Sequence, residues 1–148
     1  MSKGKSTCEI FVGQKASVSK TITEGDVYSY AGIIGDFNPY HVNHEVGKST
    51  KFGGRIVHGM LVGSFMSTII GMELPGPGCL YLEQNCAWKA PTMFGDTITM
   101  EAEVTHIKTT KDGRGIITLS NKCTNQEGIV VMEGTSKAMA PSKETSVF

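Results

Sequence analysis

Residues 56–72 read IVHGMLVGSFMSTIIGM, a run of seventeen positions without an Asp, Glu, Lys or Arg. This length is at the short edge of the roughly 17–25 apolar residues that cross a bilayer. The run also contains one His, two Ser, one Thr and three Gly, which a membrane span does not favour. We therefore interpret it as a long helix buried inside a soluble protein, apolar on nearly all of its sides.

The sequence after this run changes to the period of a β-sheet. Residues 75–78, Pro-Gly-Pro-Gly, end the helix. In residues 97–105 apolar and polar side chains alternate strictly, which predicts a half-buried strand. Asp112-Gly113 is a hairpin signal. Further strand segments are expected within 12–22, 80–85, 117–123 and 129–139.

The segment before the run carries helix signals. Thr23, with Asp26 three residues later, is typical of a helix N-terminus, and Gly35 is a plausible stop. Asn38 and Pro39 suit the cap and first position of a second, short helix, and 48–55 is expected to be a loop. The order of strand, helices and then about four antiparallel strands predicts an α+β fold in which the sheet wraps one long central helix.

That helix needs cover on the side away from the sheet. A second copy of the chain is an economical source, because most soluble oligomers are symmetric assemblies of one chain. We therefore expect a homodimer or a higher homo-oligomer.

Composition limits the function classes. The 148 residues are typical of one domain spanning 1–148, and fourteen Lys plus Arg balance fourteen Asp plus Glu. Zero net charge with twelve Lys and two Arg argues against a nucleic-acid partner. The four cysteines lack the spacing of a zinc or redox site, and the polar N-terminus does not resemble a signal peptide. We expect a cytoplasmic protein with reduced thiols and no membrane partner.

The densest group of reactive side chains is Gly-Asp-Phe-Asn-Pro-Tyr-His at 35–41. Asp36 precedes His41 by five residues, with a rigid Asn-Pro turn between them that can direct both side chains to one side. A carboxylate beside an imidazole can share proton transfer near neutral pH. The alternative is structural, with Asp36 as a cap and His41 as a packed or surface histidine. A metal site made by Asp36, His41 and His44 is a third, weakly supported reading.

A second group is Arg-Ile-Val-His-Gly-Met-Leu at 55–61. Gly59 at the start of a long buried helix leaves backbone N–H groups that can stabilise an oxyanion such as that of a thioester carbonyl. The alternative is that this glycine only relieves crowding at the helix entrance. The chain contains no GxGxxG, P-loop or GxSxG motif, so the sequence does not support a dinucleotide, a nucleoside triphosphate or a serine nucleophile.

Taken in order, these motifs resemble the MaoC-like dehydratase family, and most closely its short, single-domain (R)-specific enoyl-CoA hydratases. The resemblance rests on the stretches at 30–41 and 56–61, and it extends to Phe-Val-Gly-Gln at 11–14 and to a proline followed by Gly-Asp within 91–96. It implies a hot-dog fold, two units of which pair into a dimer. It also implies reversible hydration of trans-2-enoyl-CoA to (R)-3-hydroxyacyl-CoA, a lyase reaction, with coenzyme A as part of the substrate and no cofactor or metal.

The resemblance also implies roles for single residues. Asp36 and His41 fall on the family's catalytic pair, and Gly59 falls on the glycine whose N–H polarises the thioester carbonyl. Asn38 and Ser67 fall on orienting residues. Apart from the resemblance, the weaker expectations for substrate binding are Arg55, His58 and Tyr40.

The chain departs from the family pattern at Tyr40, Asn43 and Gly47, where an aliphatic residue, an Asp and an Ala or Ser are usual. These departures leave the acyl-chain preference open. The choice between coenzyme A and an acyl carrier protein as the carrier is also open. Lys48, Lys51 and Lys89 can, like Arg55, meet the phosphates of coenzyme A or remain solvated. The alternative functions are a hot-dog acyl-CoA thioesterase and a non-catalytic acyl-CoA binding module.

Overall fold

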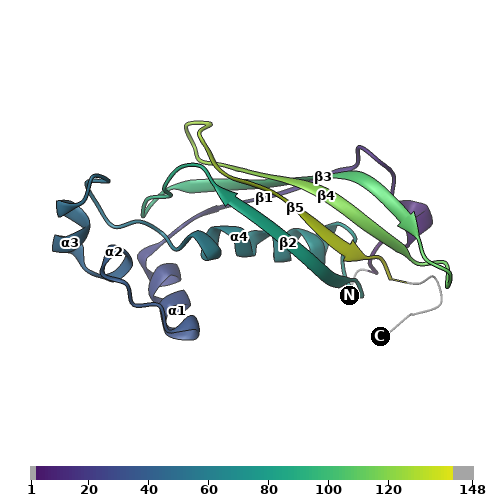
Figure 1. Cartoon of the computed structure of the whole chain (residues 1–148), viewed down its shortest axis with the longest axis horizontal. Helices are drawn as coiled ribbons and strands as arrows, with labels where there is room; N and C mark the ends of the chain where they lie inside the picture. The colour runs from purple at the N-terminus through teal and green to yellow at the C-terminus, as the bar shows by residue number, and fades with distance from the viewer. Residues whose placement is uncertain (1–2, 142–148) are drawn as a thin grey trace.

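The structure is a computed structural model that describes residues 3–141. One five-stranded antiparallel sheet, in the order β1-β3-β4-β5-β2, packs its inner face on helix α4 (Figure 1). The strands are β1 (Lys15–Thr21), β2 (Leu80–Trp88), β3 (Thr97–Thr109), β4 (Gly115–Thr124) and β5 (Val130–Met139). The helices are α1 (Glu24–Ile34), α2 (Pro39–Val42), α3 (His44–Ser49) and α4 (Gly59–Thr68), the last continued by a π-helical turn, Ile69–Glu73. The predicted α+β fold, a sheet wrapped around one long central helix, is confirmed.

Strand alternation places the core where the sequence predicts it. Ile98, Met100 and Val104 of β3 are buried, and Met100 pairs with the buried Cys123 of β4. Opposite them, the inner face of α4 buries Met66 and its apolar neighbours. The core therefore lies between one face of the sheet and one face of this helix.

The central helix begins three residues later than predicted. Ile56 lies outside it, because its N–H donates to Tyr40 O at 3.1 Å. Val57 is also extended, with its N–H donating to Thr92 O at 2.8 Å. These contacts connect residues 56–57 to α2 on one side and to the loop before β3 on the other. Helix α4 therefore starts only at Gly59.

The outer face of α4 is less apolar than predicted. Met60 is 55 % and Met72 is 62 % exposed. Between them, Ser64 and Ser67 also face outward. This face of the described chain is therefore a mixture of small polar residues and two methionines, and the sheet covers only the opposite side.

Helices α1, α2 and α3 lie together at one end of the sheet, beside the N-terminal end of α4 (Figure 1). Thr23 and Asp26 form the predicted capping box at the start of α1. The loop predicted for 48–55 begins later, because α3 runs to Ser49 and is capped by Asn43.

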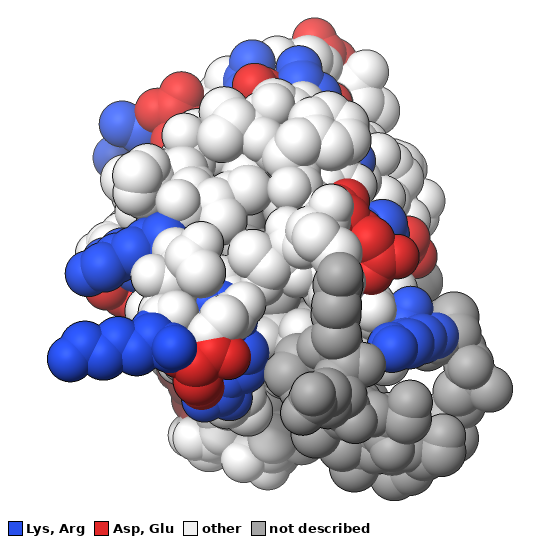
Figure 2. Space-filling view, turned by 90° about the vertical axis from the view of Figure 1, so that its right-hand side faces the viewer, with Lys and Arg blue, Asp and Glu red and all other residues white. Residues whose placement is uncertain are grey.

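Charges of both signs lie side by side on the end of the molecule that Figure 2 shows. Lys15–Glu103 and Arg114–Asp112 are two of the ion pairs at the surface. Within residues 3–141, no helix is long and apolar enough to span a membrane.

Candidate active site

The turn between α1 and α2 is built from short-range hydrogen bonds. Gly35 ends α1 in a left-handed conformation (φ 79°), and its N–H donates to Ala31 O at 2.8 Å. Asp36 Oδ1 accepts from Asn38 N–H at 3.1 Å, and Asn38 Oδ1 accepts from Tyr40 N–H at 3.1 Å. The prediction that Asn38 caps the short helix α2 is confirmed, and these bonds fix the path of the chain between Asp36 and α2.

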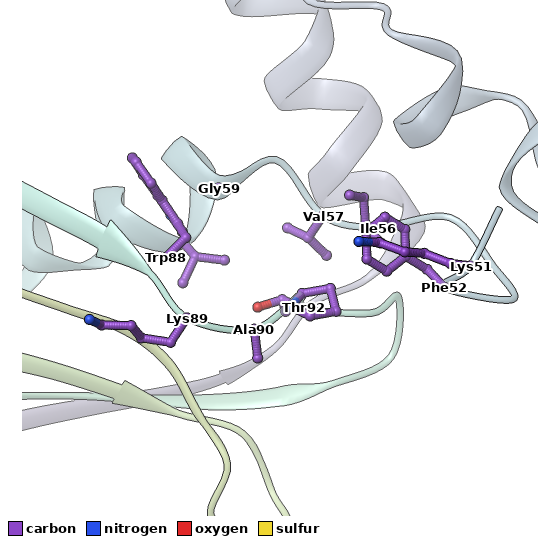
Figure 3. A pocket seen from close by; sticks show the side chains of 11 residues that line it. Lys51, Phe52, Ile56, Val57, Gly59, Trp88, Lys89, Ala90 and Thr92 are labelled. Carbon is purple, nitrogen blue, oxygen red and sulfur yellow. The ribbon is translucent and has the colours of Figure 1, made fainter.

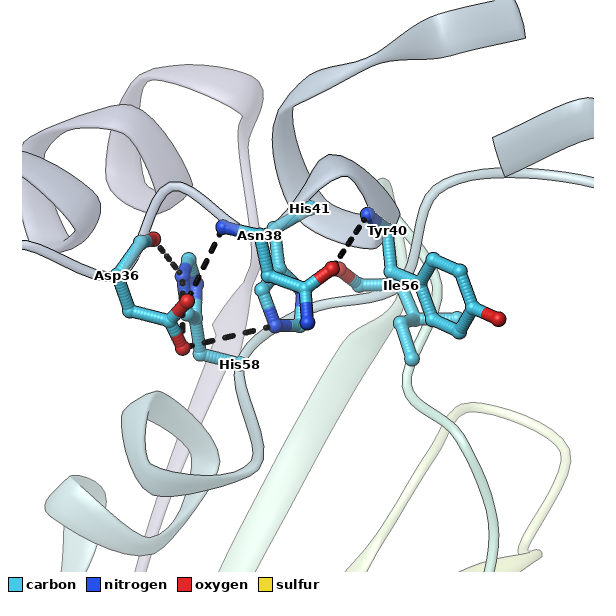
Figure 4. A network of polar contacts seen from close by, with 6 residues as sticks. All are labelled: Asp36, Asn38, Tyr40, His41, Ile56 and His58. Atoms are coloured by element: carbon cyan, nitrogen blue, oxygen red, sulfur yellow. Dashed lines mark hydrogen bonds and ion pairs between the residues drawn. The ribbon is translucent and has the colours of Figure 1, made fainter. Parts of the chain in front are cut away.

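A backbone carbonyl fixes the orientation of His41. Its Nδ1 lies 2.7 Å from Ile56 O, and because a carbonyl oxygen can only accept, Nδ1 carries the proton. In the neutral ring, Nε2 is therefore an unprotonated acceptor. This nitrogen faces Asp36 Oδ2 at 3.9 Å (Figure 4).

The gap between Asp36 and His41 suits a shared water molecule. A direct hydrogen bond needs about 2.7–3.2 Å, so the two acceptors at 3.9 Å do not bond each other. One water can donate to both across this gap. The His41 side chain is 12 % exposed and that of Asp36 is 48 % exposed, so solvent reaches the gap from the side of Asp36. Two acceptors that face one water form a site for removing a proton from it.

A second imidazole, that of His58, completes the cluster. His58 Nε2 lies 2.9 Å from Asp36 O and 3.9 Å from Asp36 Oδ2. Its ring stacks on that of His41, with centroids 3.8 Å apart and planes 30° apart. The sequence marked His58 as a weak substrate-binding residue, and nothing in the local pattern indicated that it contacts both Asp36 and His41.

The geometry of these three side chains also tests the hypothesis of a metal site. Among the described residues, the groups close enough to share an ion here are Asp36, His41 and His58, so His44 does not belong to the set. His58 Nε2, the nitrogen that faces the Asp36 carboxylate, donates its proton to Asp36 O at 2.9 Å, so it has no lone pair left for an ion. The geometry suits proton transfer better than metal binding.

Gly59 lies at the N-terminus of α4, where backbone N–H groups lack partners within the helix. Among the described residues, none accepts a hydrogen bond from the Gly59 N–H. Gly59 also lines a pocket of about 350 Å³ together with Phe52, Val57, Trp88, Ala90 and Thr92 (Figure 3). A backbone donor therefore lies at the wall of a largely apolar pocket.

The pocket and the Asp36–His41 pair share one wall. Ile56 and Gly59 both line the pocket, and the carbonyl of Ile56 is the group that holds His41. Lys51 and Lys89 line the same pocket (Figure 3).

Arg55 points away from this pocket toward α1. Its guanidinium lies 2.7 Å from Glu24 Oε1, donates to Tyr28 OH at 2.7 Å and stacks over the ring of Phe94 at 4.4 Å. Hydrogen bonds from Arg55 and Tyr28 lower the pKa of Glu24. The Arg55 side chain is only 13 % exposed, so in this chain it joins α1 to the segment before α4.

Tyr40 and Ser67 take different positions. Tyr40 is 44 % exposed beside the pair, and Figure 4 shows its ring directed away from Asp36. Ser67 is exposed on the outer face of α4, so within one chain the structure does not bring it to Asp36 and His41.

Comparison with known proteins places the chain in a family. A model described as a MaoC like domain matches residues 10–126. The chain is 42 % identical over 135 residues to an (R)-specific enoyl-CoA hydratase from Rhodospirillum rubrum, covering 91 % of each chain.

Solved structures of other proteins superpose closely on this chain. The R-hydratase PhaJ1 from Pseudomonas aeruginosa, unliganded, superposes with a TM-score of 0.86 at 35 % identity, covering 95 % of this chain and 88 % of the other. The (R)-hydratase from Aeromonas caviae involved in PHA biosynthesis gives a TM-score of 0.83 at 37 % identity, covering 89 % and 98 %. The fold is therefore a hot-dog fold.

Proposed function

The chain belongs to the MaoC-like dehydratase family, and on this premise we propose that it is a hydro-lyase that adds water reversibly to a trans-2-enoyl thioester. The product is an (R)-3-hydroxyacyl thioester. The observation that carries the proposal is the 3.9 Å gap between Asp36 Oδ2 and His41 Nε2, the nitrogen left as the acceptor when Nδ1 of the neutral ring donates to Ile56 O.

The reaction proceeds by proton transfer between water, the pair and the substrate. A water in the gap loses a proton to the pair while its oxygen bonds to C3 of the enoyl chain. The electron pair of the C2–C3 double bond moves toward the thioester carbonyl, whose oxygen gains negative charge. The free N–H of Gly59 stabilises this charge. The proton then passes from the pair to C2, so atoms and charge balance without a cofactor.

We propose coenzyme A as the carrier of the acyl group. A pocket that is largely apolar and contains Lys51 and Lys89 suits a molecule with an apolar chain and anionic phosphates. Arg55 is a weaker candidate for those phosphates, because its side chain is 13 % exposed and pairs with Glu24, whereas that of Lys89, which pairs with Glu133, is 50 % exposed. An acyl carrier protein remains the alternative carrier.

We also propose that the working unit is a homodimer. The edge strand β2 exposes Leu80 at 56 % and Leu82 at 47 %, and the outer face of α4 exposes Met60 at 55 %. A second copy would remove these apolar side chains from water. Size-exclusion chromatography with light scattering tests this state, and a monomer at micromolar concentration contradicts it.

The test of the reaction follows the loss of enoyl absorbance with crotonyl-CoA, with chiral analysis of the product. Asp36→Asn and His41→Ala should each lower kcat by about 10²–10⁴-fold, the usual effect of losing an acid–base group. His106→Asn, an exposed histidine on β3, is the matched control. A thiol-trapping dye in the same assay detects thioesterase activity. Near-normal rates in both site variants, a purely (S) product, or thiol release without hydration would overturn the proposal.

A further inference from the structure

His58 is a buried titratable side chain that the proposed reaction does not use. Its side chain is 3 % exposed, although it lies directly beside Asp36 and His41. It also occupies the cap position of α4 without making a side-chain capping bond. A buried imidazole that neither caps its helix nor faces solvent requires another explanation.

One contact ties His58 to the backbone of Asp36. Because Asp36 O can only accept, His58 Nε2 donates to it at 2.9 Å. In the neutral ring, Nδ1 is then an acceptor, and this buried atom has no hydrogen-bond partner among the described residues. His58, in the segment before α4, thus holds the backbone carbonyl of Asp36. Among the described residues, the side-chain carboxylate of Asp36 accepts a hydrogen bond only from the nearby Asn38 N–H, at 3.1 Å.

A second contact ties His58 to the ring of His41. The two rings stack at 3.8 Å, and the ring of Tyr30 also meets that of His58 in an edge arrangement at 5.4 Å. Asp36 belongs to the α1–α2 turn and His41 to α2, so one side chain touches both halves of the pair (Figure 4). His58 therefore contacts both of the groups that border the gap.

We propose that His58 is a positioning residue: as a neutral imidazole protonated at Nε2, it holds the Asp36 carbonyl and supports the His41 ring, and so maintains the gap that binds the reacting water. The functional part of this inference rests on the proposed hydration reaction. Neither substrate binding nor proton transfer suits His58, because its ring is buried and its Nε2 already donates to a backbone carbonyl.

Two amide substitutions separate the two nitrogens of the ring. The terminal nitrogen of Gln reaches about as far as Nε2 of His, whereas the nitrogen of Asn reaches only the position of Nδ1. In His58→Gln the bond to Asp36 O can re-form, and in His58→Asn it cannot. We expect kcat for crotonyl-CoA to fall about 10²-fold in His58→Asn with little change in KM, as for a misplacement near 1 Å. His58→Gln should recover most of that loss, and His106→Asn is the control.

Other roles for His58 give other results. A proton-transfer role predicts equal loss in the Gln and Asn variants, and a substrate-binding role predicts a raised KM with kcat retained. A purely structural role predicts that the variants lose stability in urea denaturation, and that their activity falls only in proportion to the fraction of unfolded protein. In an Asp36→Asn background, His58→Asn should have little further effect, because His58 acts through the Asp36–His41 pair, which this background has already disabled. Any of the three other patterns, or independent effects in the double variant, would overturn the proposal.

A spectroscopic measurement on the wild-type protein keeps this inference separate from the proposed function. Nitrogen-15 spectra of the histidine rings should show His58 protonated at Nε2 and His41 protonated at Nδ1. A His58 ring protonated at Nδ1, or at both nitrogens at neutral pH, contradicts the positioning contact even in an active enzyme. The predicted tautomers in a protein that does not hydrate crotonyl-CoA would leave the contact standing and remove the proposed reaction.

Discussion

Gly59→Ala places a methyl group where the indole ring of Trp88 already lies. A Cβ at position 59 would be 2.7 Å from Trp88 Nε1, 2.9 Å from Cε2 and 3.1 Å from Cδ1. Comfortable contact between such atoms is about 3.5–4.0 Å, so the ring has to retreat by roughly 0.5–1 Å. Trp88 is 46 % exposed at the end of β2, so it can move outward without disturbing the core.

Two effects of opposite sign act on stability. Gly59 does not have a positive φ, so Ala fits the backbone and stabilises by about 0.4–1 kcal/mol through the unfolded chain. Overpacking costs about 1–3 kcal/mol, and the half-exposed ring keeps this cost toward the low end. We expect a net loss in the free energy of unfolding of roughly 0.5 kcal/mol.

Removing the indole ring of Trp88 should reverse the sign of the change in stability caused by Gly59→Ala. In a Trp88→Ala background the added methyl no longer meets the indole, so Gly59→Ala should stabilise by about 0.4–1 kcal/mol. Urea denaturation followed by circular dichroism gives the four free energies of this double-mutant cycle. Trp88 is the single tryptophan of the chain, so a red shift of the emission in Gly59→Ala directly reports the displaced ring. An equal cost in both backgrounds, with unchanged emission, would refute the reasoning.

The same substitution tests the role of the Gly59 N–H. The added methyl group lies on a residue that lines the pocket, so it crowds the thioester beside the N–H, and kcat should fall between about 10- and 100-fold. A variant that loses stability but keeps kcat would separate the packing argument from the proposed oxyanion role.

Two further predictions concern α1. Arg55→Lys loses the planar stack on Phe94 and should lower the free energy of unfolding by about 1 kcal/mol in urea, and unchanged stability would contradict a structural role for this contact. Hydrogen bonds from Lys20 and then Thr23 lower the pKa of Asp26 from 3.8 to about 2, so its charged form stabilises the fold above pH 3.8 and this contribution is lost as the pH falls through about 2. Asp26→Asn should therefore be less stable than wild type at pH 6, with a difference that shrinks toward pH 2, and a difference that is constant with pH would contradict this.

Local interactions account for the parts of the fold that the sequence predicts. The Thr23–Asp26 capping box, the stop at Gly35 and the Asn38 cap each depend on residues at most four positions apart. The alternation along β3 likewise depends only on which face of one strand is buried. Patterns of this kind are readable because the residues that form the contact are neighbours in the chain.

Long-range contacts account for what the sequence misses. The apolar run suggested a helix from Ile56, but the backbone of Ile56 bonds Tyr40 and His41 instead. The sequence likewise does not show that the charge of Arg55 has a partner, because Glu24 comes close to it only in the folded chain. His58 looked like a neighbour of Gly59, and its contact with Asp36 joins positions 22 residues apart. Such pairings depend on the tertiary structure, and no local period encodes them.

The segment from Ile56 to Gly59 links the two parts of the proposed reaction, because Ile56 and Gly59 line the pocket and Ile56 also contacts His41. Ile56 holds His41 through its carbonyl, and Gly59 offers its N–H three residues later, a distance of at most about 11 Å along an extended chain. In a 2-enoyl thioester the attacked carbon is conjugated with the carbonyl and lies only two bonds from the carbonyl carbon. The proposed reaction therefore requires that a thioester oxygen bound at Gly59 leave C3 at the gap between Asp36 and His41. A 3-enoyl thioester lacks this conjugation, so charge from attack cannot reach the oxygen at Gly59, and the same geometry selects the position of the double bond.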